Sequence, residues 1–98
     1  SSSASIAACG MLEMMKSLEP EEADIYLNYA KQMMKSLYDS YAVKDPAKSN
    51  GLVLHSTYSN HSPYNTCNHY GVDECNSWGD YFYMEALTRL RKDWELYW

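Results

Sequence analysis

Apolar side chains recur every third or fourth residue along one stretch of the chain, and this spacing constrains the fold more than any other feature. The stretch contains Ala23, Leu27, Ala30, Met34, Leu37 and Tyr41. Side chains with this spacing lie on one face of an α-helix, whereas the charged residues Lys31 and Asp39 fall off that face. Pro20 suits the first turn of a helix, because its missing N–H costs nothing there. The pattern therefore predicts an amphipathic helix over residues 20–42.

The preceding segment has a helical pattern built from small and sulfur-containing residues. We predict a helix over residues 5–18, in which Ala8, Cys9 and Gly10 let a neighbouring backbone approach closely. Such a surface needs another helix against it. The first two helices are therefore expected to form a hairpin.

A third helix is predicted over residues 77–94. Its apolar positions step by four and three residues and are Tyr83, Leu87, Leu90 and Trp94. Ser77 is a suitable N-cap, and Asp80 is placed three residues later to close a capping box. Glu85 and Arg89 have the spacing of an i,i+4 ion pair on this helix.

The segments between the second and third helices are polar. VKDPAKSNG, residues 43–51, reads as a connection because of its proline and its Asn-Gly end. Residues 52–54 are a short extended piece. Residues 59–76 are a long loop rich in Asn, Ser, His and Tyr, and loops of this length are usually either functional or disordered.

Charge and composition exclude several classes of partner. The 98-residue chain has a net charge of −5 and lacks the basic stripe that phosphate backbones require, so no nucleic-acid partner is expected. No apolar run approaches the roughly 20 residues that span a bilayer, so no membrane partner is expected. The chain opens on SSSAS without an initiator methionine, from which we expect it to be a piece of a longer protein.

The three cysteines indicate the cellular compartment. Cys9, Cys67 and Cys75 are an odd number without the spacing of a disulfide framework. No secretory signal precedes them, so a reduced, cytoplasmic setting is expected. A pairing of Cys67 with Cys75 stays open if their loop folds back.

Three carboxylates before the third helix are candidates for acid–base chemistry. Asp73, Glu74 and Asp80 could take opposite protonation roles if their environments differ. Alternatively, all three stabilise the positive end of the helix dipole and carry no reaction. The second interpretation is favoured, because nothing in the sequence fixes the separation of the carboxylates and charge at a helix start requires no reaction.

Imidazoles and thiols in the long loop raise a zinc hypothesis. The possible ligands are His55, His61, His69, Cys67 and Cys75. Their spacing lacks the tight pairs of structural zinc sites, so we expect neither a metal nor a cofactor. His55, at the end of the extended piece, is the best placed of the set to face a pocket.

Hydroxyls and aromatic rings on the loop suit a sugar ligand. Tyr58, Ser59 and Ser62 can hydrogen-bond a polyol, but they lack a partner that would activate a nucleophile. Aromatic faces pack on the C–H surfaces of sugars. Trp94 has the spacing of a core residue, as does Trp98, whereas Trp78 at the helix start could serve either role.

Four blocks of the chain resemble the C-terminal part of the unsaturated glucuronyl hydrolases of glycoside hydrolase family 88. The blocks are SSSASIAACGMLEM, NGLVLHSTYS, GVDECNSWGDYFYMEALTRL and KDWELYW. The resemblance implies an all-α fold, namely the C-terminal segment of a six-hairpin (α/α)6 toroid in a bacterial, cytoplasmic enzyme. It also implies removal of 4,5-unsaturated uronic acid from lyase-generated oligosaccharides by hydration of the double bond, without metal or cofactor.

The resemblance assigns this segment to the wall of the substrate pocket. The catalytic aspartates of the family belong to earlier helices, so no catalytic residue is expected in this chain. Ser59 and Ser62 match the serines of a Ser-x-x-Ser-x-Lys motif that contacts sulfate, but Tyr64 stands where the lysine would be. The resemblance also places Tyr58 and His55 near the pocket, and it leaves a preference for sulfated substrates in doubt.

Three helices cannot close a toroid, so two predictions follow for the isolated chain. We expect it to be inactive, and to self-associate or pair with the missing N-terminal part through apolar faces left uncovered. The rival interpretation is a small helical interaction module without catalytic activity. A third is a small domain stabilised by zinc.

Overall fold

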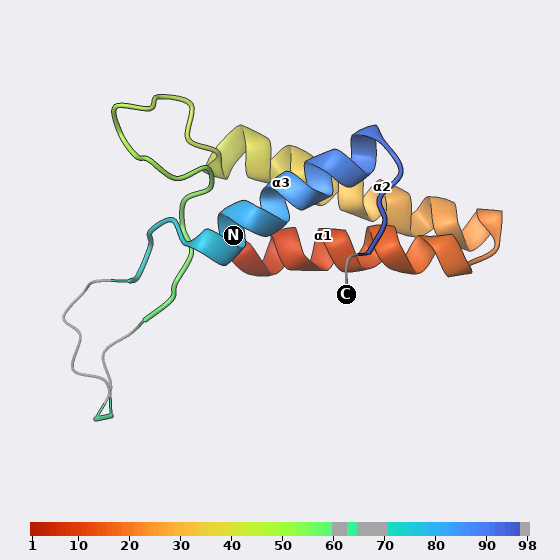
Figure 1. Ribbon diagram of the computed structural model, residues 1–98, viewed down its shortest axis with the longest axis horizontal. Helices are drawn as coiled ribbons and strands as arrows, with labels where there is room; N and C mark the ends of the chain where they lie inside the picture. Colours follow the sequence, from red (N-terminus) through yellow and green to blue (C-terminus); the bar gives the residue numbers. More distant parts are fainter. Residues whose placement is uncertain (60–62, 65–70, 97–98) are drawn as a thin grey trace.

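The computed structural model describes residues 1–59, 63–64 and 71–96 and contains three α-helices (Figure 1). Helix α1 spans Ser2–Met14 and continues into the 3₁₀ turn η1, Met15–Ser17. Helix α2 spans Pro20–Ser36 and continues into the π-helical turn η2, Leu37–Tyr41. Helix α3 spans Ser77–Arg91. The described residues include no β-strand.

The helix bounds differ from the prediction at two ends. Helix α1 begins at Ser2 instead of residue 5, because the amide of Ser5 already donates to the carbonyl of Ser1 at 3.2 Å. Helix α3 ends at Arg91 instead of residue 94, because Lys92 has extended dihedrals (φ −154°, ψ 165°). Trp94 therefore lies on the tail that follows the helix.

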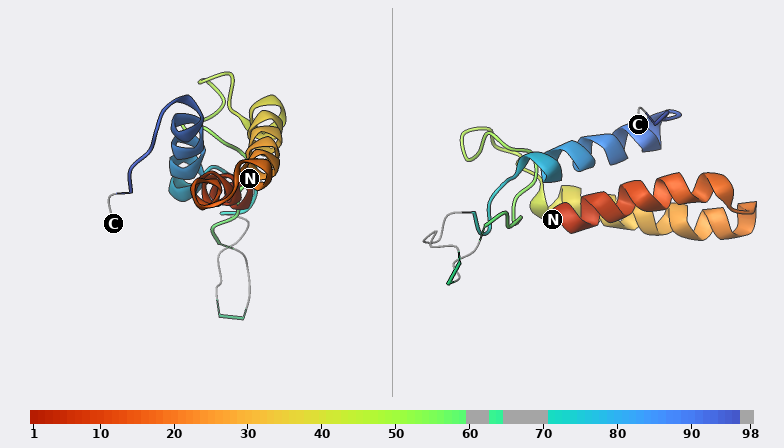
Figure 2. Two further views of the ribbon diagram at one scale, coloured as in Figure 1. Left: turned by 90° about the vertical axis from the view of Figure 1, so that its right-hand side faces the viewer. Right: turned by 60° about the horizontal axis from the view of Figure 1, so that its bottom comes forward.

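Helix α1 is the central element of the bundle. It packs against α2 as the predicted antiparallel hairpin and also against α3, whereas α2 and α3 contact each other little. Figure 2 shows α3 crossing beside the α1–α2 hairpin and diverging from it toward its C-terminal end.

The core lies where the three helices meet. Its buried side chains are Ala8, Cys9, Leu12, Ala30, Met34, Leu37, Val53, Tyr83 and Ala86. The α2 members follow the predicted stripe, and Lys31 and Asp39 are exposed as expected. Burial of these apolar side chains supplies the main driving force for the fold.

Two residues that were predicted to lie in helix contacts are instead exposed. Gly10 is exposed, and a Cβ added there would meet nothing within 4 Å, so helix contact is made by the other face of α1. Leu87 is 39% exposed, whereas Tyr83 of the same stripe is buried and Leu90 packs against the core. In addition, none of the described helices is both long and apolar enough to span a bilayer.

Candidate functional site

The predicted site residues lie on two chain limbs, residues 55–59 and 71–76, which we call the neck. The neck leaves the bundle beside the N-terminal ends of α1 and α3 (Figure 1). An isolated antiparallel bridge joins the limbs, with Ser56 N–H donating to the carbonyl of Glu74 at 2.8 Å and Glu74 N–H donating back at 2.9 Å. His55, Tyr58 and Ser59 lie on the first limb, and Ser62 lies outside the described residues.

Ser56 anchors the neck to the helices. Its side chain is 1% exposed, and its hydroxyl accepts from the amide of Ser2 in α1 at 3.2 Å. A Cβ added at Gly79, in the first turn of α3, would lie 3.2 Å from the same hydroxyl. The bridge is therefore held against the starts of two helices, a feature that the sequence analysis missed.

Gly71 allows the two limbs to approach each other. Its carbonyl accepts from the amides of Tyr58 at 2.7 Å and Ser59 at 3.2 Å. It has φ of 89°, and an added Cβ would lie 2.8 Å from the Cβ of Ser59 and 2.9 Å from Cε2 of Tyr58. Only glycine adopts this conformation at low cost and leaves this space free.

His55 and Asp73 face each other across the neck. Nδ1 of His55 is hydrogen-bonded to Oδ1 of Asp73. Both residues have left-handed backbone conformations, with φ of 65° and 61°. The Tyr41 ring at the end of η2 and the imidazole make a T-shaped contact, with ring centroids 5.4 Å apart and planes at 84°. Asp73 thus pairs with an imidazole and does not cap the helix.

Tyr58 and Trp78 form an aromatic corner beside this pair. Their ring centroids are 6.3 Å apart with planes at 90°, and the residues are 48% and 44% exposed. The hydroxyl of Tyr58 donates to Oε2 of Glu74 at 3.1 Å. Trp78, which the sequence left undecided, therefore presents its ring at the surface near the predicted pocket residues.

The predicted capping box is wrong. Asn76 is the N-cap, and its Oδ1 accepts from the amide of Gly79 at 2.7 Å. Asp80 accepts instead from the amides of Leu52 and Val53, both at 3.0 Å, and so ties the extended piece to α3. The third carboxylate, Glu74, binds Tyr58, so the three acids have separate partners and do not form an acid–base pair among themselves.

The zinc hypothesis falls mainly on residues that the structure does not describe. His61, Cys67 and His69 lie outside the described residues, as does the open pairing of Cys67 with Cys75. Sγ of Cys75 lies 3.4 Å from Oγ of Ser49. Within the described ranges, no three His, Cys, Asp or Glu side chains are grouped as a metal site would require.

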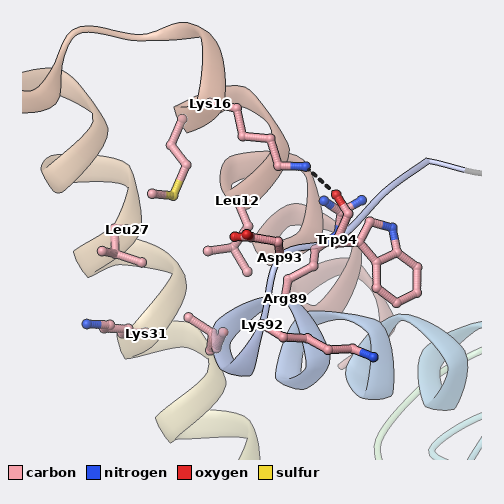
Figure 3. Close-up of a pocket in the computed structure, with 10 residues that line it drawn as sticks. Leu12, Lys16, Leu27, Lys31, Arg89, Lys92, Asp93 and Trp94 are labelled. Carbon is pink, nitrogen blue, oxygen red and sulfur yellow. Dashed lines mark hydrogen bonds between the residues drawn. The ribbon is translucent and has the colours of Figure 1, made fainter.

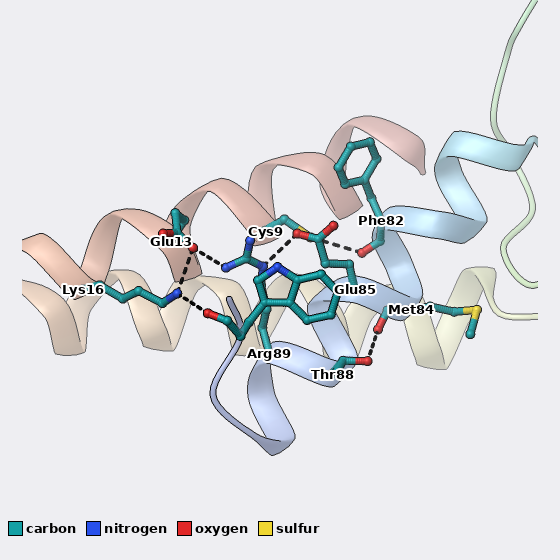
Figure 4. A network of polar contacts seen from close by, with 9 residues as sticks. Cys9, Glu13, Lys16, Phe82, Met84, Glu85, Thr88 and Arg89 are labelled. Carbon is teal, nitrogen blue, oxygen red and sulfur yellow. Dashed lines mark hydrogen bonds and ion pairs between the residues drawn. The ribbon is translucent and has the colours of Figure 1, made fainter. Parts of the chain in front are cut away.

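A charge network connects α1, α3 and the C-terminal tail. Arg89 donates from Nε to Glu85 at 2.8 Å and from its guanidinium to Glu13 of α1. The predicted Glu85–Arg89 pair is present, but its side chains are only 3% and 5% exposed. Lys16 donates to Glu13 at 3.0 Å and to the carbonyl of Trp94 at 2.8 Å (Figure 4).

The same network surrounds the thiol of Cys9. Burial, with the nearby Glu85 carboxylate, raises the pKa of Cys9 to about 12, so the thiol stays protonated. It donates to the carbonyl of Phe82 at 3.2 Å. Cys9 is therefore a buried packing residue, as its helical position indicated.

A pocket of about 270 Å³ lies at the end of the bundle away from the neck (Figure 3). Its apolar lining comes from Leu12, Met15, Leu27, Leu90 and Trp94, and its polar lining from Lys16, Lys31, Arg89, Lys92 and Asp93. This pocket could not be predicted from the sequence, because its walls come from all three helices and the tail.

Comparison with known proteins finds relatives over the whole chain. No family model matches. The chain is 45% identical over 100 residues to an unsaturated chondroitin disaccharide hydrolase of Streptococcus pneumoniae, and 32% identical over 100 residues to an unsaturated glucuronyl hydrolase of Bacillus sp.. It spans 24% and 25% of the lengths of these two relatives.

Solved structures give the same result. A crystal structure of an unsaturated glucuronyl hydrolase mutant from Streptococcus agalactiae matches with a TM-score of 0.83 and 41% identity, over 99% of this chain and 25% of that chain. The Bacillus sp. GL1 unsaturated glucuronyl hydrolase matches with a TM-score of 0.72 and 30% identity, over 93% of this chain and 23% of that one. These proteins have an (α/α)6 toroid fold, so the three helices are arranged as in one segment of such a toroid.

Proposed function

We propose that this chain, which is homologous to the C-terminal part of the unsaturated glucuronyl hydrolases, is part of a glycoside hydrolase that removes 4,5-unsaturated uronic acid from oligosaccharides. In this reaction water adds across the double bond of the uronic acid, and the hemiketal that results opens and releases the remaining sugar. The observation that carries the proposal is 45% identity over the whole chain to an unsaturated chondroitin disaccharide hydrolase.

The neck supplies one wall of the substrate pocket in this proposal. Tyr58 and Trp78 present exposed ring edges and faces next to each other, which suits the C–H surface of a sugar ring. His55 and Ser59 lie on the same limb as Tyr58. None of the described residues is given a catalytic role, because the three carboxylates near the neck bind His55, Tyr58 and backbone amides.

The substrate we propose is an unsaturated disaccharide of the chondroitin type, in line with the names of the streptococcal relatives. Tyr64, at the position of the motif's lysine, is 99% exposed and carries no charge that could bind sulfate. We therefore expect the sulfated and unsulfated disaccharides to be bound with similar affinity. The enzyme is proposed to act in the cytoplasm.

The isolated chain is proposed to be inactive and to need the rest of the toroid. Large apolar side chains are exposed on the outer faces of its helices, and they include Ile25, Tyr29, Tyr38, Met84 and Leu87. Such faces favour pairing with missing helices or with a second copy. Sizing of the purified chain checks this, and a monomer with cooperative melting would instead favour the interaction module.

A graft tests the activity directly. This chain replaces the corresponding quarter of the S. pneumoniae hydrolase, and loss of the ultraviolet absorbance of the uronate double bond is followed with unsaturated chondroitin disaccharide. We expect the graft to be active and the truncated hydrolase without any graft to be inactive. A folded graft without activity, as judged by circular dichroism and size, contradicts the proposal.

A further inference from the structure

The neck contains two non-glycine residues in a conformation that such residues rarely adopt. His55 and Asp73 have φ of 65° and 61°, in the left-handed region where Cβ crowds the backbone. They occupy equivalent places, each preceding one partner of the Ser56–Glu74 bridge. A conformation of this kind persists only when surrounding contacts hold it, and it is most common at functional sites.

Side-chain contacts hold His55 and Asp73 in this conformation. Each side chain is the hydrogen-bond partner of the other, and the imidazole also makes an edge-to-face contact with the Tyr41 ring, with the centroids 5.4 Å apart. The bridge next to them is fixed by the buried hydroxyl of Ser56. The pair therefore links the end of η2 to both limbs, at the point where the limbs leave the helices.

The direction of both limbs beyond this point depends on these two dihedral angles. Tyr58 follows His55 by three residues, and its amide is bound to Gly71 at 2.7 Å. Its hydroxyl is bound to Glu74, the residue after Asp73, at 3.1 Å. A change at either member of the pair would therefore move the Tyr58 ring relative to Trp78.

We propose that His55 and Asp73 are positioning residues whose mutual hydrogen bond holds the Tyr58–Trp78 corner in the geometry that binds the sugar. The role in sugar binding rests on the proposed function, whereas the effect on the neck does not. Neither residue is assigned a contact with reacting atoms. The side chains act by holding two left-handed backbones against Tyr41 and against each other.

Amide hydrogen exchange of this chain tests the pair without substrate. In His55→Ala we expect exchange of the Tyr58 and Glu74 amides to be faster by about tenfold or more, while the Ala30 amide in α2 is unchanged. His55→Asn should stay within about threefold of the original chain, because Asn tolerates the left-handed region and can donate to Asp73. Asp24→Asn, at an exposed carboxylate of α2, is the control and should leave exchange of the Tyr58 and Glu74 amides unchanged. Equal exchange in the original chain and His55→Ala, with the helices intact, overturns the proposal.

The graft into the S. pneumoniae hydrolase tests the consequence for binding. His55→Ala should raise KM by about tenfold with kcat changed less than about threefold, because the lost interaction is made equally in the ground and transition states. His55→Asn should restore KM. A fall in kcat alone would overturn the positioning role. An inactive original graft would contradict the proposed function, while the exchange experiment still decides the role of the pair.

Discussion

The neck and the Arg89 network are both held by side-chain hydrogen bonds, but the two regions differ in burial. The network lies between α1 and α3, with Arg89 and Glu85 almost fully buried. In the neck the His55 and Asp73 side chains are 47% and 68% exposed, and the limbs depend on backbone hydrogen bonds and two left-handed residues. Breaking a buried ion pair lowers the stability of the whole fold, whereas an exposed pair contributes little to stability and mainly fixes the local course of the backbone. The comparison predicts global effects from one region and local effects from the other.

The largest effect is expected from Arg89→Met. It leaves Glu85 buried without its partner, and breaking a buried pair in this way costs about 3–5 kcal/mol. Chemical denaturation of the purified chain measures the loss. Arg91→Met, at an exposed position two residues along α3, is the control and should change stability by less than about 0.5 kcal/mol. Equal effects of the two variants would remove the distinction between the regions.

Asp80→Ala is expected to act on the boundary between the regions. The carboxylate accepts from the amides of Leu52 and Val53, and leaving donors without partners costs about 1–3 kcal/mol for each buried group. Val53 is fully buried, so we expect a loss of about 2 kcal/mol in denaturation. Asp80→Asn keeps one acceptor oxygen and should lose about half as much. A loss as small as that of Asp24→Asn would show that the two bonds contribute nothing.

Two Gly→Ala substitutions should change the stability of the chain in opposite directions. Gly71→Ala places a Cβ 2.8 Å from that of Ser59 at a φ of 89°, and we expect a loss of about 1–3 kcal/mol confined to the neck. Gly10→Ala meets no atom within 4 Å on an exposed helix face and should stabilise the chain by about 0.5–1 kcal/mol. Thermal melting measures Gly10→Ala, and amide exchange in the neck measures Gly71→Ala. Stabilisation by both would mean that the limbs are not close-packed at Gly71.

The smallest effect concerns the acid stability of the network. Hydrogen bonds from Arg89 and Lys16 lower the pKa of Glu13 from its ordinary value of 4.5. Because the folded pKa is the lower one, the contribution of Glu13 is present above about pH 4.5 and is lost as pH falls through the folded pKa. Glu13→Gln should therefore lose less stability on acidification than the original chain. Denaturation midpoints at neutral and acid pH measure the difference, and parallel pH curves would contradict the assignment.

In the neck, candidate pocket residues could be predicted from the sequence, but their partners could not. The sequence singled out His55, Tyr58 and Ser59 as pocket residues, and the structure places them on one limb. It gave no indication of the partner of His55, because Asp73 is 18 residues away and was interpreted as a helix-capping charge. The correct N-cap was also missed, since Ser77 and Asn76 are both good capping residues and only the backbone angles of the two positions distinguish them.

The burial of Glu85 and Arg89 was missed for a similar reason. An i,i+4 spacing indicates that two side chains meet on a helix, but it does not say whether another helix covers them. Helix α1 covers this pair and adds Glu13 to it. The sequence shows only that Glu85 and Arg89 lie next to the apolar stripe of α3. Charged residues at such positions can be either buried or exposed.

The amino-acid sequence by itself determined the three helices, the inward face of α2 and the similarity to the unsaturated glucuronyl hydrolases. These properties depend on interactions between residues three or four apart or on direct similarity of residues. Tertiary structure alone decided which carboxylate meets which partner, that Leu87 of α3 is exposed, and how two left-handed residues come to face each other. Those contacts join residues far apart in the chain, and their geometry is set by the packing of helices and not by local spacing.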